Sequence, residues 1–149
     1  MAVAGKPNVG KSTLINRFVG QTIAAVSTRP QTTQRNQLGI VTRPLAQAIF
    51  VDTPGLHRPH HKLGLRMNTA AEYAIRDADL ILFVLDASHP PDEEDRRVAD
   101  RVSVAAPDHP VVVALNKSDA ATTETSTASR RPLFEWLPAS EVWPVSAER

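Results

Sequence analysis

One short stretch near the N-terminus limits what this chain can fold into more than any other. Residues 5–12 read Gly-Lys-Pro-Asn-Val-Gly-Lys-Ser, the G-x-x-x-x-G-K-[ST] spacing of a phosphate-binding loop. Two glycines let the backbone turn tightly and direct successive N–H groups at phosphate oxygens. Such a loop follows a strand and opens a helix. Its flanks agree, because apolar Val3 and Ala4 precede it and residues 11–18 have a helical pattern.

The residues of this loop have distinct expected roles. The Lys11 ammonium is suited to the β- and γ-phosphates and the Ser12 hydroxyl to Mg²⁺. The positive end of the helix dipole that follows favours the same anion. The residues expected to bind the nucleotide phosphates are Asn8, Val9, Gly10, Lys11, Ser12 and Thr13.

Composition narrows the class of protein. The 149 residues suffice for one domain with a full core. A net charge of +1 gives no overall field that would attract nucleic acid or an anionic membrane. Cysteine is absent, which excludes disulfides and cysteine-based zinc sites. The sequence has no apolar run of about 18 residues and no signal-peptide pattern. We therefore expect a cytoplasmic monomer without a transmembrane segment.

The chain is expected to form a single domain over residues 1–149, with no second domain. Only residues 1–4 precede the loop and no helix follows the last strand-like run, so we expect a domain truncated at both ends.

Strand-like and helical patterns alternate along the chain. We expect strands at 36–42, 47–52, 80–85, 111–115 and 141–145, and helices at 11–18, 65–77, 92–105 and 131–137. The first two strands suggest a hairpin with an antiparallel edge, and residues 48–51 look apolar enough for burial on both faces. This alternation predicts a three-layer α/β fold with a mostly parallel sheet. The side chains expected to point inward are Leu65, Met67, Ala71, Ala74, Ile75, Trp136 and Trp143.

Polar motifs stand at the ends of four expected strands, and parallel sheets bind ligands beyond the carboxyl ends of their strands. We therefore expect the four motifs to converge on one rim. They are residues 5–12, Asp52 to Gly55, Asn116 to Asp119, and Ser146 with Ala147.

The second motif and a polar loop are expected to complete the magnesium and γ-phosphate site. Asp52 follows an apolar strand, where a carboxylate can reach Mg²⁺ as a Walker B acid does. The Gly55 N–H is placed to contact the γ-phosphate. Thr33, with Thr32 as the alternative, is expected to bind Mg²⁺ through its hydroxyl. The metal ligands are thus Ser12, Thr33 and Asp52, and the residues acting on the γ-phosphate are Lys11, Thr33 and Gly55.

The third and fourth motifs indicate guanine. Guanine presents two adjacent donors that the Asp119 carboxylate can accept together, whereas adenine has no such pair. Asn116 is expected to hold guanine N7 and the neighbouring loops, and the stem of Lys117 to pack along the base. Ser146 and Ala147 would bring the Ala147 N–H to guanine O6.

These motifs resemble a Ras-like, translation-factor-class GTPase domain. Residues 5–13, 31–33, 52–57 and 116–119 resemble most closely the Era-type GTPases of bacterial ribosome assembly, with Der-type and tRNA-modification GTPases as alternatives. The resemblance implies GTP or GDP with Mg²⁺, GTP hydrolysis and a role in 16S rRNA maturation. In that family a following KH domain binds small-subunit rRNA, so an rRNA partner is expected for a longer protein and not through this domain. The resemblance also leaves peripheral membrane association open.

Two positions bear on the mechanism. Ras-like enzymes orient the attacking water with a Gln after the glycine of D-x-x-G, and this chain has Leu56 there. We therefore expect slow intrinsic hydrolysis. Asn8 matches a residue that coordinates K⁺ in potassium-stimulated relatives of this family, which suggests stimulation by K⁺.

Alternatives remain open. Residues 57–62 suit a solvated loop, a ribosome contact, or metal binding by histidines. The chain as a whole suits a GTP-hydrolysing switch, or a GTP-gated RNA- or ribosome-binding module with negligible intrinsic hydrolysis. A P-loop kinase is disfavoured, because residues 116–119 indicate guanine.

Overall fold

A computed structural model describes residues 1–23, 36–56, 62–122, 135–137 and 139–148. Within these ranges the chain forms a six-stranded sheet of order β2-β3-β1-β4-β5-β6. The strands are β1 (Ala2–Ala4), β2 (Gln37–Arg43), β3 (Ala46–Asp52), β4 (Ile81–Asp86), β5 (Val111–Asn116) and β6 (Ala139–Pro144). The helices are α1 (Lys11–Val19), α2 (Lys62–Arg76) and α3 (Glu93–Ala105).

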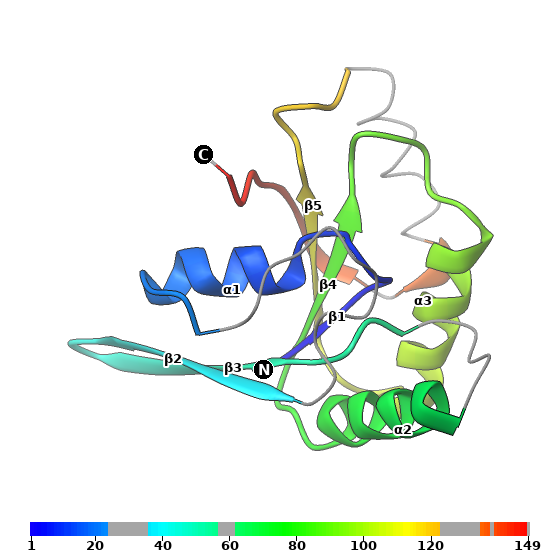
Figure 1. Cartoon of the computed structure of the whole chain (residues 1–149), viewed down its shortest axis with the longest axis horizontal. Helices are drawn as coiled ribbons and strands as arrows, with labels where there is room; N and C mark the ends of the chain where they lie inside the picture. The colour runs from blue at the N-terminus through cyan, green and yellow to red at the C-terminus, as the bar shows by residue number, and fades with distance from the viewer. Residues whose placement is uncertain (24–35, 57–61, 123–134, 138, 149) are drawn as a thin grey trace.

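The sheet is parallel except for its β2–β3 edge pair. Figure 1 shows α1 on one face of the sheet and α2 and α3 on the other. This three-layer arrangement confirms the α/β fold predicted from the alternating pattern. The crossovers between parallel strands place the helices on both faces.

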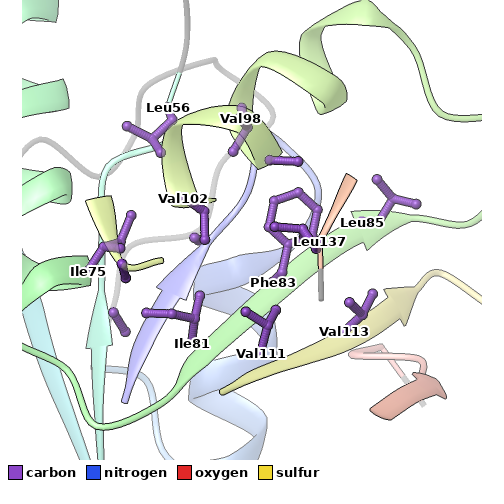
Figure 2. Close-up of a cluster of buried hydrophobic side chains, with 14 of the residues drawn as sticks. Leu56, Ile75, Ile81, Phe83, Leu85, Val98, Val102, Val111, Val113 and Leu137 are labelled. Carbon is purple, nitrogen blue, oxygen red and sulfur yellow. The ribbon is translucent and has the colours of Figure 1, made fainter. Parts of the chain in front are cut away.

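Each face of the sheet has its own core because strand side chains alternate in direction. In β1, Ala2 and Ala4 belong to the core under α2 and α3, whereas Val3 belongs to the core under α1. In β4, Phe83 likewise faces α2 and α3 (Figure 2) and Val84 faces α1. All six residues of β4 are buried, as the apolar run from Ile81 to Leu85 predicts for the first five; the sixth is Asp86.

The prediction that residues 48–51 are buried on both faces is wrong. Phe50 is buried against α1, where its ring stacks on that of Phe18, but Ile49 is 44% exposed. β1 pairs with β3 only at Val51 and Asp52. The rest of the β2–β3 hairpin therefore extends past β1 (Figure 1), and no helix of the described residues covers its second face.

Two other predicted core positions are also wrong. α2 begins at Lys62, and its buried stripe runs through Gly64, Met67, Asn68, Ala71 and Ile75, which leaves Leu65 56% exposed and Ala74 half-buried. Trp143 is exposed on the edge strand β6, where its indole N–H donates to Glu141 at 2.6 Å. Trp136 packs against the core, as predicted. Most of the helix expected at 131–137 lies outside the described residues.

Candidate nucleotide-binding site

The two glycines of the phosphate-binding loop are required by close contacts at the rim. Gly5 has a φ of 153° and Gly10 a φ of 96°. A Cβ atom on Gly5 would lie 2.5 Å from the Val84 carbonyl oxygen, and one on Gly10 would overlap the Asn116 side-chain amide. The loop therefore passes directly over the ends of β4 and β5, which only glycine permits.

Lys11 lies inside this loop with its ammonium held by backbone. Its Nζ donates to the carbonyl oxygens of Gly5 at 3.1 Å and Lys6 at 2.9 Å. Burial lowers the pKa of Lys11 to about 8, although the nearby Asp52 carboxylate opposes the shift. Within the described part of the chain, the Lys11 ammonium is hydrogen-bonded to neutral carbonyls alone, and a buried cation of this kind is well suited to an anionic ligand.

Ser12 and Asp52 meet at the start of α1. The Ser12 hydroxyl donates to the Asp52 carboxylate at 2.6 Å, and Asp52 is fully buried at the end of β3. The next residue, Thr53, donates to the Val3 carbonyl at 2.7 Å and fixes this turn against β1. A hydroxyl and a carboxylate oxygen are ligands that Mg²⁺ accepts, so these residues fit the predicted ion. Thr32 and Thr33 lie outside the described residues.

The turn after Asp52 packs against the phosphate-binding loop. A Cβ atom on Gly55 would lie 2.8 Å from the Pro7 backbone nitrogen, and the Leu56 N–H donates to the Gly5 carbonyl at 3.3 Å. The Leu56 side chain is fully buried in the core under α2 and α3 (Figure 2). The position that carries a water-orienting Gln in Ras-like enzymes thus contributes a core side chain here.

Asn116 joins the phosphate-binding loop to the last predicted motif. Its side-chain amide donates to the Val9 carbonyl at 2.8 Å, and its carbonyl oxygen accepts from the Ala147 N–H at 3.0 Å. The Ser118 N–H also donates to the Val145 carbonyl at 3.1 Å. The four motifs therefore converge on one rim, as predicted. The N–H expected at guanine O6 is here bonded to Asn116.

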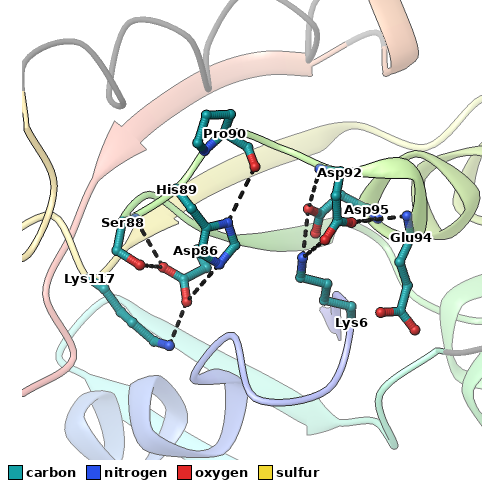
Figure 3. Close-up of polar contacts among 9 residues, drawn as sticks. All are labelled: Lys6, Asp86, Ser88, His89, Pro90, Asp92, Glu94, Asp95 and Lys117. Carbon is teal, nitrogen blue, oxygen red and sulfur yellow. Dashed lines mark hydrogen bonds and ion pairs between the residues drawn. The ribbon is translucent and has the colours of Figure 1, made fainter.

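Lys117 is held by a carboxylate that sequence reasoning missed. Its ammonium donates to Asp86 at 2.5 Å, and the backbone and hydroxyl of Ser88 donate to the same carboxyl group at 3.0 and 2.6 Å (Figure 3). Burial raises the pKa of Asp86, but the bonds from Lys117 and Ser88 outweigh it and leave the pKa below its usual value. The available signal was an acid at the end of a buried strand, the same signal that identified Asp52.

The remaining predicted residues lie at or beyond this rim. Asp119 is exposed in the turn that follows β5, two residues after Lys117, which has a left-handed φ of 60°. The Ser146 hydroxyl is buried, and no described residue hydrogen-bonds to it. The histidine-rich segment 57–61 lies outside the described residues.

Comparison with known proteins identifies the family. A family model described as "50S ribosome-binding GTPase" matches residues 1–117. The chain is 44% identical over 153 aligned residues to GTPase Era of Pseudomonas aeruginosa, covering 99% of this chain and 48% of that protein. It is 50% identical over 121 residues to GTPase Era of Deinococcus radiodurans, covering 81% of this chain and 38% of that protein.

Solved structures agree with these relatives. A crystal structure of Era with MgGDPNP and nucleotides 1506–1542 of 16S ribosomal RNA has a TM-score of 0.87 and 35% identity, covering 98% of this chain and 50% of that one. A single-residue variant of Aquifex aeolicus Era bound to GDP·AlF₄⁻ has a TM-score of 0.86 and 34% identity over the same shares. The chain thus spans about half the length of these relatives. Among the described residues, no helix combines the length and hydropathy needed to span a membrane.

Proposed function

The chain belongs to the 50S ribosome-binding GTPase family, and from this premise we propose that it binds GTP with Mg²⁺, hydrolyses it to GDP and works as a molecular switch. The observation that carries the proposal is the pair of hydrogen bonds made by Asn116. They connect Val9 of the phosphate-binding loop to Ala147 of the base-side loop. One continuous rim can therefore hold a nucleotide by its phosphates at one end and by its base at the other.

The phosphate end has the chemistry that phosphoryl transfer needs. The loop N–H groups and Lys11 would bind the phosphates, and Gly55 would contact the γ-phosphate with its backbone. Ser12, Asp52 and Thr33 would hold Mg²⁺, which neutralises charge on the β- and γ-phosphate oxygens. The hydrogen bond between Ser12 and Asp52 brings two of these proposed ligands together.

The base end would select guanine through Asp119, as the sequence predicts. Titration calorimetry with GDP, GTP and ATP tests this, and ATP binding as tight as GTP binding would contradict it. In Asp119→Asn, GDP affinity should fall roughly 10- to 100-fold, since two hydrogen bonds to a charged acceptor are lost. Affinity for xanthosine diphosphate should rise, because the amide offers a donor to the xanthine carbonyl. Unchanged GDP affinity would overturn the base assignment.

The intrinsic hydrolysis rate should be slow because Leu56 is part of the core and offers no group to orient water. A module that binds GTP and hydrolyses it only with a partner is therefore a second candidate. Single-turnover GTP hydrolysis with and without small ribosomal subunits distinguishes the two. Rapid hydrolysis by the chain alone would contradict the expectation of a slow rate.

We further propose that K⁺ stimulates hydrolysis through Asn8. The left-handed backbone of Asn8, with a φ of 65°, supports a special role for this loop position. Single-turnover rates in matched K⁺ and Na⁺ buffers test the proposal, with Asn8→Ala as the comparison variant. Equal rates in the two salts would remove it.

For the longer protein we propose a role in small-subunit assembly and 16S rRNA maturation, because one similar structure is an Era complex with a 16S rRNA segment. The RNA contact would come from outside this 149-residue domain, whose net charge is only +1. A binding assay of the chain with that RNA segment should show no specific binding. The cytoplasmic location and the monomeric state remain predictions.

A further inference from the structure

Lys6 is a buried cation of the phosphate-binding loop that the proposed chemistry does not use. Figure 3 shows its side chain directed toward Asp92 and Asp95 at the start of α3. Its Nζ donates to Asp92 at 2.7 Å and to Asp95 at 2.9 Å. The loop is thus joined to a helix that lies more than eighty positions away in the sequence.

Both carboxylates also organise the first turn of α3. Asp92 is the N-cap and accepts the N–H groups of Glu94 at 2.9 Å and of Asp95 at 3.0 Å. Asp95 in turn accepts the Asp92 N–H at 3.0 Å and completes a capping box. Each acid therefore bonds the helix start and Lys6 at once. This geometry gives Lys6 a fixed anchor, because capping holds the acids in place.

The cluster depends on charge balance. Asp95 is only 2% exposed, whereas Asp92 is 54% exposed. Burial raises the pKa of Asp95, and the Lys6 ammonium opposes that shift. Removing the ammonium would leave a buried carboxylate without its cation, which is strongly unfavourable.

The same residue supports the phosphate-binding lysine through its backbone. The Lys6 carbonyl accepts from the Lys11 ammonium at 2.9 Å, and the neighbouring Gly5 carbonyl accepts at 3.1 Å. Movement of residue 6 would therefore displace Lys11. The side chain of Lys6 fixes residue 6 against α3, so the position of Lys11 depends on contacts that touch no ligand.

We propose that Lys6, Asp92 and Asp95 form a tether that holds the phosphate-binding loop against α3 and sets its affinity for the nucleotide diphosphate group. Lys6 is a positioning residue in this arrangement. The inference rests on the proposed nucleotide binding. It predicts equal losses for GDP and GTP when the tether is broken, because both contain the β-phosphate.

The test compares GDP affinity with unfolding temperature in three variants. Lys6→Met keeps most of the stem and removes the charge, so GDP affinity should fall roughly 2- to 30-fold, the range for residues that act through others, and the unfolding temperature should also fall. In Lys6→Met/Asp95→Asn the buried charge is relieved, so the unfolding temperature should recover while GDP affinity stays low. Lys6→Arg keeps the cation and should restore affinity.

A matched control lies on the same helix turn. Arg97 pairs with Glu93 at 2.9 Å, but the two side chains are 51% and 79% exposed. Arg97→Ala should change neither quantity, because exposed ion pairs contribute little.

Two outcomes would overturn the inference. GDP affinity in Lys6→Met that matches the unsubstituted chain contradicts it alone. The inference is also contradicted if the double variant regains both GDP affinity and unfolding temperature. Lower stability alone would then explain the loss of affinity in Lys6→Met. Failure of the unsubstituted chain to bind GDP would instead contradict the proposed function on which the inference rests.

Discussion

The two ends of the rim give their lysine ammonium groups different hydrogen-bond partners. At the phosphate end, Lys11 is buried, and among the residues that the structure describes its ammonium bonds only the backbone carbonyls of Gly5 and Lys6. At the base end, the Lys117 ammonium bonds the Asp86 carboxylate directly. Burial lowers the pKa of Lys11 to about 8, whereas the Lys117 pair leaves the pKa of Asp86 below its usual value.

The difference fits the ligand proposed for each lysine, which is a phosphate for Lys11 and the base for Lys117. A lysine whose ligand is an anion gains most if the protein leaves its charge without a bonded carboxylate, because the ligand then supplies the neutralising charge. A lysine that lies along an uncharged base has no such partner, so the protein supplies one. Asp86 and Ser88 fix the ammonium at the end of β4, which orients the apolar stem.

The largest expected effect comes from removing the phosphate-end charge. Lys11→Met should weaken GDP binding by at least about 100-fold, because charge-assisted bonds to the phosphates are lost. The nucleotide-free protein should not lose stability, since a poorly solvated ammonium is replaced by an apolar group of similar length. Calorimetric titration and thermal unfolding measure the two quantities. Retained GDP affinity would contradict the role of Lys11 and remove the contrast between the two ends.

The next effect is a dependence on alkaline pH, which we expect from Lys11 at the phosphate end. The folded pKa of Lys11, about 8, lies below its ordinary value of 10.5. Between these two values the unfolded chain binds more protons, so the nucleotide-free protein should gain stability as the pH rises. GDP affinity should instead fall, by up to about tenfold per pH unit above pH 8, because binding requires the ammonium.

The same pH titration on Lys11→Met distinguishes the effect of Lys11 ionisation from that of nucleotide ionisation. The variant should lack the Lys11 contribution to both the stability trend and the affinity trend. Parallel pH profiles for the two proteins would show that Lys11 keeps an ordinary pKa.

The smallest effect is expected at the base end. Asp86→Asn keeps the shape of the side chain and removes its charge, so Lys117 loses a charge-assisted bond but remains near its position. GDP affinity should fall only roughly 2- to 10-fold, the value of a single hydrogen bond. Guanosine binding should fall by the same factor, because the phosphates are not involved. If GDP binding fell while guanosine binding stayed unchanged, Asp86 would act at the phosphate end, and the proposed difference between the two ends would be wrong.

The sequence predicted the rim better than it predicted burial. Each motif directly follows a strand of the parallel sheet, so its position along the sequence places it at the carboxyl edge of that sheet. This holds for Gly5 to Ser12, Asp52 to Gly55 and Asn116 to Asp119. Burial depends on which elements cover a side chain. Ile49 and Trp143 are apolar yet exposed, because one lies in a hairpin that extends beyond the helices and the other on an edge strand.

Two ion clusters were also not predicted from the sequence. Asp86 reaches Lys117 from a neighbouring strand, and Asp92 and Asp95 reach Lys6 from the start of α3. No spacing in the sequence links these partners, because their distance along the chain is unrelated to their distance in space. Thr33 lies outside the described residues, so its role as a magnesium ligand remains a prediction.

The amino-acid sequence by itself determined the order of strands and helices, the phosphate-binding loop and the residues expected to select guanine. These depend on local patterns, in which a few residues at fixed offsets specify a turn or a helix start. The tertiary structure alone decided which charges neutralise one another and which apolar side chains stay exposed. Those outcomes depend on contacts between distant segments, and such contacts exist only once the sheet has brought the strand ends together.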